Sequence, residues 1–135
     1  VGLRGSLYGA EDWTSLRDDL GLEYLTTEDV LAIGAPEASR RIRYRVGDRP
    51  AFISFDIDVV DPAFAPGTGT PEAGGPSAHD LLAILRLLTG ITFVGFDVVE
   101  VIPAYDPAGQ TATLAAALAY EMLSLVALRR LQLPR

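Results

Sequence analysis

A short apolar run that ends in three carboxylates constrains this chain most. Residues 51–55 read AFISF, a pattern typical of a buried strand in a parallel sheet, and Asp56, Asp58 and Asp61 follow it directly. Strand side chains two positions apart share a face, so Asp56 and Asp58 are expected to point the same way. Adjacent carboxylates in apolar surroundings either hold a proton or bind a cation, and a hard divalent ion such as Mn²⁺ or Mg²⁺ suits oxygen ligands. An isolated pair of this spacing is commonly just a solvated strand end, so the spacing alone leaves both alternatives open.

Proline and glycine shape the stretch that follows the carboxylates. Proline fixes the backbone angle φ, and glycine reaches conformations that other residues avoid. This composition predicts a rigid loop, which could form one wall of a site at the carboxyl end of the strand. Thr68 and Thr70 lie in the loop, where their hydroxyls could stabilise it or contact a substrate. The residues concerned are Pro62, Pro66, Gly67, Gly69, Pro71, Gly74 and Gly75.

The rest of the chain alternates between strand and helix patterns, which predicts a parallel sheet of right-handed βαβ units within one domain. Capping and stop signals set the expected boundaries. The expected strands are 1–4, 23–25, 51–55 and 91–99. The expected helices are 11–20, a short one capped by Thr27 and ended by Gly34, one from Pro36 to Val46, one capped by Ser77 and ended by Gly90, and 112–131.

Composition excludes several classes of function. The net charge of −7 and the acidic pI argue against a nucleic-acid partner, and the absence of cysteine excludes disulfides and thiolate metal sites. We find no leader and no apolar run of about 18 residues, so no membrane partner is expected and a cytoplasmic location is the default. The chain opens at Val1 on a strand-like pattern, and we expect it to be part of a longer product.

Four further titratable residues are candidates for a functional or structural role. Glu100 follows the expected strand 91–99, so it too lies near a strand's carboxyl end. Asp97 faces the opposite side in an ideal strand and is expected to be a structural carboxylate bonded to loop amides. Asp61, before a proline, is expected to form a turn rather than bind a metal. His79, the single histidine, is expected on the surface in the first turn of a helix.

A longer motif points to one family. Residues 54–62 (SFDIDVVDP), 65–72 (APGTGTPE) and the following glycine pair closely resemble the second metal-binding signature of the ureohydrolases, the arginase and agmatinase family. Residues 2–9 (GLRGSLYG) and 96–107 (FDVVEVIPAYDP) extend the resemblance over essentially the whole chain. It covers only the carboxyl-terminal half of the family. It therefore implies that residues 1–135 are the carboxyl-terminal part of an arginase-like three-layer α/β/α sandwich with a mainly parallel sheet.

The resemblance also implies a reaction and a site. Ureohydrolases hydrolyse a guanidino compound to an amine and urea at a dinuclear manganese site. By this resemblance Asp56 would bridge both Mn²⁺ ions, Asp58 would bind one of them, Glu100 would bind the substrate guanidinium, and Thr70 would line the active site. The family's remaining ligands, supplied by histidine and aspartate motifs, have no counterpart here. The chain alone is therefore expected to be inactive or nearly so.

Several alternatives remain open on the sequence. The two motifs APGTGTPE and GLRGSLYG look more like agmatinases than arginases, but a guanidinobutyrase or another amidino hydrolase would carry nearly the same residues. A catalytically inactive remnant or an interaction domain is the alternative of a different class. A magnesium-dependent phosphotransfer domain is disfavoured because the chain has no lysine. The expected partner is a small guanidino substrate, and a homo-oligomer is expected for the full-length protein.

Overall fold

A computed structural model describes residues 1, 2 and 15–132 of the chain. Residues 3 and 4 of the predicted strand 1–4 and most of the GLRGSLYG motif lie outside the described residues. The elements in chain order are a π-helical turn η1 (Ser15–Asp19), α2 (Thr27–Val46), β1 (Pro50–Asp56), a 3₁₀ turn η2 (Ile57–Val59), α3 (Ala78–Arg86), β2 (Thr92–Val99), a 3₁₀ turn η3 (Pro103–Tyr105) and α4 (Gln110–Gln132). The predicted strands at 51–55 and 91–99 are therefore confirmed.

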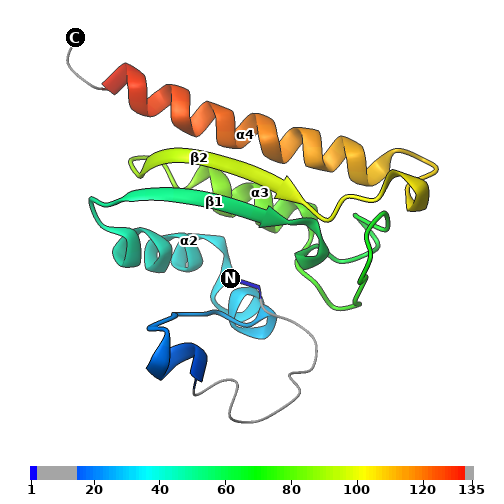
Figure 1. Cartoon of the computed structure of the whole chain (residues 1–135), viewed down its shortest axis with the longest axis horizontal. Coiled ribbons are helices and arrows are strands. Elements are labelled where there is room, and N and C mark those ends of the chain that lie inside the picture. Colours follow the sequence, from blue (N-terminus) through cyan, green and yellow to red (C-terminus); the bar gives the residue numbers. More distant parts are fainter. Residues whose placement is uncertain (3–14, 133–135) are drawn as a thin grey trace.

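The two strands form a parallel sheet, as predicted. Ile53 lies level with Phe96 and Asp56 with Val99. Helix α3 lies behind the strands, between α2 on the side of β1 and α4 along β2 (Figure 1). This arrangement confirms the α/β fold with a parallel sheet. Within the described residues it amounts to two strands with helices packed on them.

Alternation along β1 separates a packed face from an open one. Ile53 and Phe55 pack into the core with residues of α3 and α4, whereas Phe52, Ser54 and Asp56 are exposed. The core residues contributed by the helices are Leu81, Ile84, Leu85, Leu114, Leu118, Met122 and Leu125. One face of the sheet thus holds the hydrophobic core, and the other is left uncovered by the described residues.

Helix α3 begins as the sequence predicts. The Ser77 hydroxyl accepts a hydrogen bond from the Asp80 N–H (3.2 Å), and the Asp80 carboxylate accepts one from the Ser77 N–H (3.0 Å). This reciprocal capping satisfies N–H groups that the first turn of a helix leaves unpaired. Leu88 beyond the helix is also buried, which completes the predicted apolar stripe.

Helix α2 begins one residue earlier than predicted. Thr26, not Thr27, is the cap: its hydroxyl accepts the Asp29 N–H (3.1 Å), and the Asp29 carboxylate accepts the Thr26 N–H (3.0 Å). Thr27 is instead buried and donates its hydroxyl to the Gly2 carbonyl (3.2 Å). Two adjacent threonines offer the same capping group, and this long-range contact decides between them.

The predicted break at Gly34 is confirmed as a kink within α2. Gly34 has φ 70° and ψ 172°, a conformation that glycine adopts easily and that interrupts the helix before Pro36. Contrary to the prediction, residues 23–25 lie in no strand within the described part of the chain; the Gly2 N–H donates one hydrogen bond to the Leu25 carbonyl (2.8 Å). Of the predicted helix 11–20, the described part is only the turn η1.

Helix α4 is unusually long and apolar. By length and composition alone, residues Gln110–Leu131 could span a membrane, which corrects the expectation that no such run exists. Leu118 and Met122 of this helix are nonetheless buried in the core, and α4 contacts both β2 and α3. Core helices of soluble proteins pass the same test of length and composition.

The loop after β1 is bonded to the segment that follows β2. The Gly67 N–H donates to the Thr111 hydroxyl (2.8 Å), and the Gly67 carbonyl accepts the Ile102 N–H (2.8 Å). The Asp106 carboxylate, 7% exposed, accepts the backbone N–H groups of Thr111 (3.0 Å) and Ala112 (2.8 Å) at the start of α4. These contacts hold the two loops at the carboxyl edge of the sheet against each other.

The close approach at Gly67 predicts a stability defect. A Cβ at this position would lie 2.5 Å from the Asp106 Cβ and 2.9 Å from the Thr111 hydroxyl oxygen. We expect Gly67→Ala to lower the free energy of unfolding by about 1–3 kcal/mol, since backbone must shift to admit the methyl group. Gly69→Ala is the matched control, because its Cβ would meet only the Ile102 Cδ1 at 3.4 Å. Urea denaturation measures both, and equal effects at the two glycines would contradict the account.

The Asp106 cap predicts a pH dependence. Hydrogen bonds from the Ala112 and Thr111 N–H groups favour the ionised form and hold the pKa of Asp106 below its ordinary value of 3.8. Because the folded pKa is lowered, the stabilisation is present above that ordinary value and is lost as pH falls through the folded pKa. We expect Asp106→Asn to lower the Tm at pH 7 and the deficit to shrink from pH 5 to pH 3.

The exposed Asp97 offers the control, since Asp97→Asn removes a carboxylate that caps no helix. A deficit for Asp106→Asn that stays constant between pH 7 and pH 3 would show that the charge of Asp106 is not what stabilises the start of α4.

Candidate active site

The first two candidate carboxylates lie where β1 turns into η2. β1 ends at Asp56, and its side-chain oxygen accepts the Asp58 N–H (2.9 Å), which caps the 3₁₀ turn. Ile57 between them is fully buried, as predicted. The prediction that strand alternation places Asp56 and Asp58 on one face is wrong, however, because the chain leaves the strand after Asp56. The tight turn, rather than strand alternation, sets their relative positions.

Asp58 is bonded to the glycine- and proline-rich loop. The Thr70 hydroxyl donates to an oxygen of the half-buried Asp58 carboxylate. This contact spans 12 residues and orients the carboxylate from the loop side. Thr70 therefore lies beside a candidate metal ligand. The composition of the loop does not predict its contact with Asp58.

Asp61 forms the turn predicted for it. One oxygen accepts the Ala63 N–H (2.9 Å), and the other accepts the N–H groups of Gly74 (2.8 Å) and Gly75 (3.1 Å). The carboxylate thus closes the loop on itself. Because its oxygens are occupied by backbone amides, Asp61 serves the loop's shape.

Glu100 stands at the end of β2 in an unusual backbone conformation. Its φ is 64°, and it is the one non-glycine residue among the described residues with a positive φ. Such a conformation costs an ordinary residue about 1–2 kcal/mol. The buried Thr68 donates its hydroxyl to the Glu100 carbonyl (2.9 Å) and so fixes the strained residue from the neighbouring loop. Strain of this kind is often retained at functional sites, where it directs a side chain.

The remaining sequence candidates have mixed outcomes. His79 is exposed at the start of α3, as predicted. Asp97 is exposed on the open face of the sheet, level with Ser54. No hydrogen bond from the described part of the chain reaches its carboxylate, so the loop amides predicted to bind it are not found among the described residues. Tyr105 is largely exposed in η3.

The described residues fit part of a metal site. Carboxylate oxygens suit a hard divalent cation, and Asp56 and Asp58 present such oxygens at one strand end. Across residues 1, 2 and 15–132, however, no group of three or more histidine, cysteine, aspartate or glutamate side chains is placed to hold a metal ion. These two carboxylates therefore need ligands from elsewhere to make a complete metal centre.

The sequence interpretation missed the contacts that hold the site together. Asp106 caps a helix that begins four residues later, outside the spacing of an ordinary N-cap, and Thr111 accepts from a glycine 44 positions away. The usable signal was the motif match itself, which includes Asp106. No local rule identifies Thr111 as a partner of Gly67.

The known proteins most relevant to this chain are named as agmatinases or as an amidino hydrolase. "Putative agmatinase 1" of Schizosaccharomyces pombe is 46% identical over 91 residues, which is 67% of this chain and 23% of that protein. The structure of proclavaminate amidino hydrolase from Streptomyces clavuligerus matches with a TM-score of 0.86 and 41% identity over 95% of this chain and 41% of that one. A hypothetical agmatinase from Burkholderia thailandensis gives a TM-score of 0.86 and 45% identity over 98% of this chain and 39% of that one.

The matches cover most of this chain but only a minor part of each similar protein. The chain spans about a quarter of the length of the fission-yeast relative and about two fifths of the two solved chains. The sequence model of the arginase family matches residues 1–124. The expected family resemblance is thereby confirmed over nearly the whole chain, and the chain belongs to the arginase family.

Proposed function

We propose that Asp56, Asp58 and Glu100 form part of the active site of a ureohydrolase that converts a guanidino compound to an amine and urea. The observation that carries the proposal is the arrangement at the carboxyl edge of the sheet. Asp56 and Asp58 leave one strand through a capped turn, and Glu100 leaves the adjacent strand in a strained conformation. Ligand sites of open α/β sheets occur at this edge. The names of the similar proteins support the same reaction class.

Each carboxylate has a chemically suitable role. Asp56 and Asp58 would hold divalent metal, which we propose to be manganese, together with ligands from outside the described residues. Such a metal, when bound, activates water for hydrolysis and stabilises developing negative charge. Glu100 would bind the substrate, because a carboxylate can accept two parallel N–H groups from a planar guanidinium. Thr70 would act by orienting Asp58.

Agmatine is the substrate that we propose first. Two of the similar proteins carry an agmatinase name, in fission yeast and in Burkholderia thailandensis. The similar Streptomyces protein is named for proclavaminate instead, so the site's chemistry fits guanidino compounds as a class. Guanidinobutyrate is the alternative that the sequence motifs leave open. A cytoplasmic location and a homo-oligomeric full-length protein stay predictions.

Manganese titration tests the metal role of the carboxylates. We expect isothermal titration of the 135-residue chain to show weak binding, because two carboxylates alone make a poor site. The double variant Asp56→Asn/Asp58→Asn should abolish that binding, whereas Asp97→Asn, an exposed carboxylate on the neighbouring strand, should leave it unchanged.

Urea release from agmatine, measured on the same samples, is expected to be near zero for the chain alone. Manganese binding that survives in the double variant would refute the assigned ligands. Tight binding of two equivalents with turnover would instead show that the chain holds a complete site, contrary to the expectation above.

The strain at Glu100 gives a test that separates function from stability. Glycine adopts φ 64° without the steric cost, although it loses more backbone entropy on folding. We expect Glu100→Gly to unfold at higher urea, with a net gain of about 0.5–1 kcal/mol, and Glu100→Ala to show no such gain. Both variants should lose guanidinium binding, measured as agmatine affinity by calorimetry. A destabilised Glu100→Gly protein would contradict the strain assigned to this residue, and unchanged agmatine affinity of both variants would contradict its role in guanidinium binding.

A further inference from the structure

Glu100 lies at a joint where its backbone alone sets the direction of its side chain. The residue directly follows β2, whose last residue, Val99, is held level with Asp56 by strand pairing. Within the described part of the chain, no hydrogen bond or ion pair reaches the exposed Glu100 carboxylate. The backbone conformation of Glu100 therefore decides where this carboxylate points.

The Thr68 hydroxyl holds the backbone on the far side of this joint. Thr68 is 2% exposed, and its hydroxyl donates to the Glu100 carbonyl (2.9 Å). This bond fixes the peptide that follows Glu100, as β2 fixes the one before it, and φ is 64° between them. The steric cost of a positive φ is similar in size to the contribution of one hydrogen bond. Loss of the bond is therefore expected to let Glu100 relax to a negative φ.

Other contacts hold the loop that carries Thr68. The Gly67 N–H donates to the Thr111 hydroxyl (2.8 Å), and the Gly67 carbonyl accepts the Ile102 N–H (2.8 Å). Neither bond uses the Thr68 hydroxyl. The loop is thus expected to keep its place when that hydroxyl is removed, so the direction of Glu100 can be changed separately from the fold of the loop.

We propose that Thr68 is a positioning residue for the substrate, because its hydroxyl keeps the Glu100 carboxylate in the direction that accepts two N–H groups of a guanidinium. A pair of parallel hydrogen bonds requires a carboxylate plane of fixed direction, whereas an ammonium is a compact charge that tolerates several directions. Thr68 therefore favours a guanidinium over an ammonium without touching either group. The inference rests on the proposed role of Glu100 and adds the residue that controls it.

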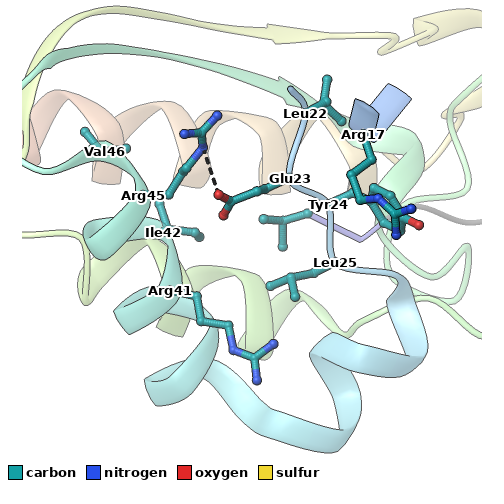
Figure 2. A pocket seen from close by; sticks show the side chains of 10 residues that line it. Arg17, Leu22, Glu23, Tyr24, Leu25, Arg41, Ile42, Arg45 and Val46 are labelled. Carbon is teal, nitrogen blue, oxygen red and sulfur yellow. Dashed lines mark ion pairs between the residues drawn. The ribbon is translucent and has the colours of Figure 1, made fainter. Parts of the chain in front are cut away.

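A cavity elsewhere offers a cationic ligand a different carboxylate. It has a volume of about 420 Å³ and lies between residues 22–25 and α2 (Figure 2). Its carboxylate, Glu23, is paired with Arg45 (3.4 Å), and two further arginines line the cavity. Three guanidinium groups repel a cation. Agmatine is therefore expected to bind at Glu100, and the variant Glu23→Gln should leave its affinity unchanged.

Calorimetry on the 135-residue chain compares two ligands. They are agmatine and diaminobutane, the diamine of the same carbon chain, which carries an ammonium in place of the guanidinium. We expect Thr68→Val, which removes the donor and keeps the shape, to weaken agmatine binding at least about tenfold, because a hydrogen bond to a charged group is lost. Diaminobutane affinity should change less than about twofold. Thr68→Ser keeps a hydroxyl and should restore agmatine binding.

A second measurement needs no ligand. A positive φ brings the amide and Hα protons of one residue close together, so the nuclear Overhauser effect between these protons of Glu100 should be strong in the unaltered chain. It should weaken in Thr68→Val and return in Thr68→Ser. Thr68→Ala, which removes the same donor, replaces Thr68→Val if that variant does not fold by circular dichroism.

Thr27 provides the matched control. It is 1% exposed, and its hydroxyl also donates to a distant backbone carbonyl, that of Gly2 (3.2 Å). Thr27→Val removes the same kind of bond and should lower the Tm as Thr68→Val does. Both ligand affinities and the Overhauser effect of Glu100 should stay as in the unaltered chain, because a purely structural loss does not redirect this side chain.

Three results would overturn the role of Thr68. They are an Overhauser effect of Glu100 that is weak in the unaltered chain or unchanged without the donor, agmatine affinity that Thr68→Val leaves intact while Glu100→Ala lowers it, and equal losses for agmatine and diaminobutane. Failure of the proposed function gives a different pattern. Agmatine that does not bind, or that Glu23→Gln rather than Glu100→Ala displaces, would contradict the function and with it the selection of a guanidinium. The Overhauser effect would still decide whether Thr68 sets the conformation of Glu100.

Discussion

Because β1 and β2 pair in parallel, Asp56 lies level with Val99, and the loops that leave both strands begin at one edge of the sheet. Strand pairing by itself does not hold these loops together. The Thr68 hydroxyl bonded to the Glu100 carbonyl does so, with the two backbone bonds of Gly67. Hydroxyl and backbone groups thus hold the two loops against each other, and the Asp58 carboxylate adds a contact to the first of them through the Thr70 hydroxyl.

The aspartates of this edge divide into two groups by what their oxygens contact. Those of Asp61 and Asp106 accept several backbone N–H groups and set the shape of a loop and the start of a helix. Asp56 and Asp58 lie in the tight turn after the strand, where Asp58 is approached by a hydroxyl. The printed contacts of Asp61 and Asp106 thus assign these two carboxylates to the structure of the loop and the helix, a role that residue type alone does not reveal.

Local signals explain most of what the sequence could predict. The Ser77 cap, the break at Gly34 and the apolar runs of both strands depend on residues within a few positions, and all are found in the structure. The failures involve distant contacts. The sequence does not reveal the role of Thr27, because its bond to Gly2 spans 25 residues. The strand expected at 23–25 is reduced to one backbone bond from Gly2 among the described residues.

The candidate site shows the same limit more sharply. Motif matching assigned Asp56, Asp58 and Glu100, but only the three-dimensional structure shows the strained φ of Glu100 and the contact between Thr70 and Asp58. These features depend on how two loops contact each other, and a single sequence does not predict contacts between residues so far apart. Gly67 is an example: only glycine fits there, because a Cβ would collide with Asp106, which lies 39 positions later in the sequence.

The apolar sequence of β1 links the stability of these residues to the position of the site. A strand with apolar side chains and no edge protection belongs in the middle of a sheet, where both edges are paired. The carboxyl end of a middle strand is also the place where groups from strands on both sides can converge on one ion or substrate. At the end of an edge strand, they could come from one side only. The ligation proposed for Asp56 and Asp58 would therefore be favoured by a neighbour along the edge of β1 that no described strand covers.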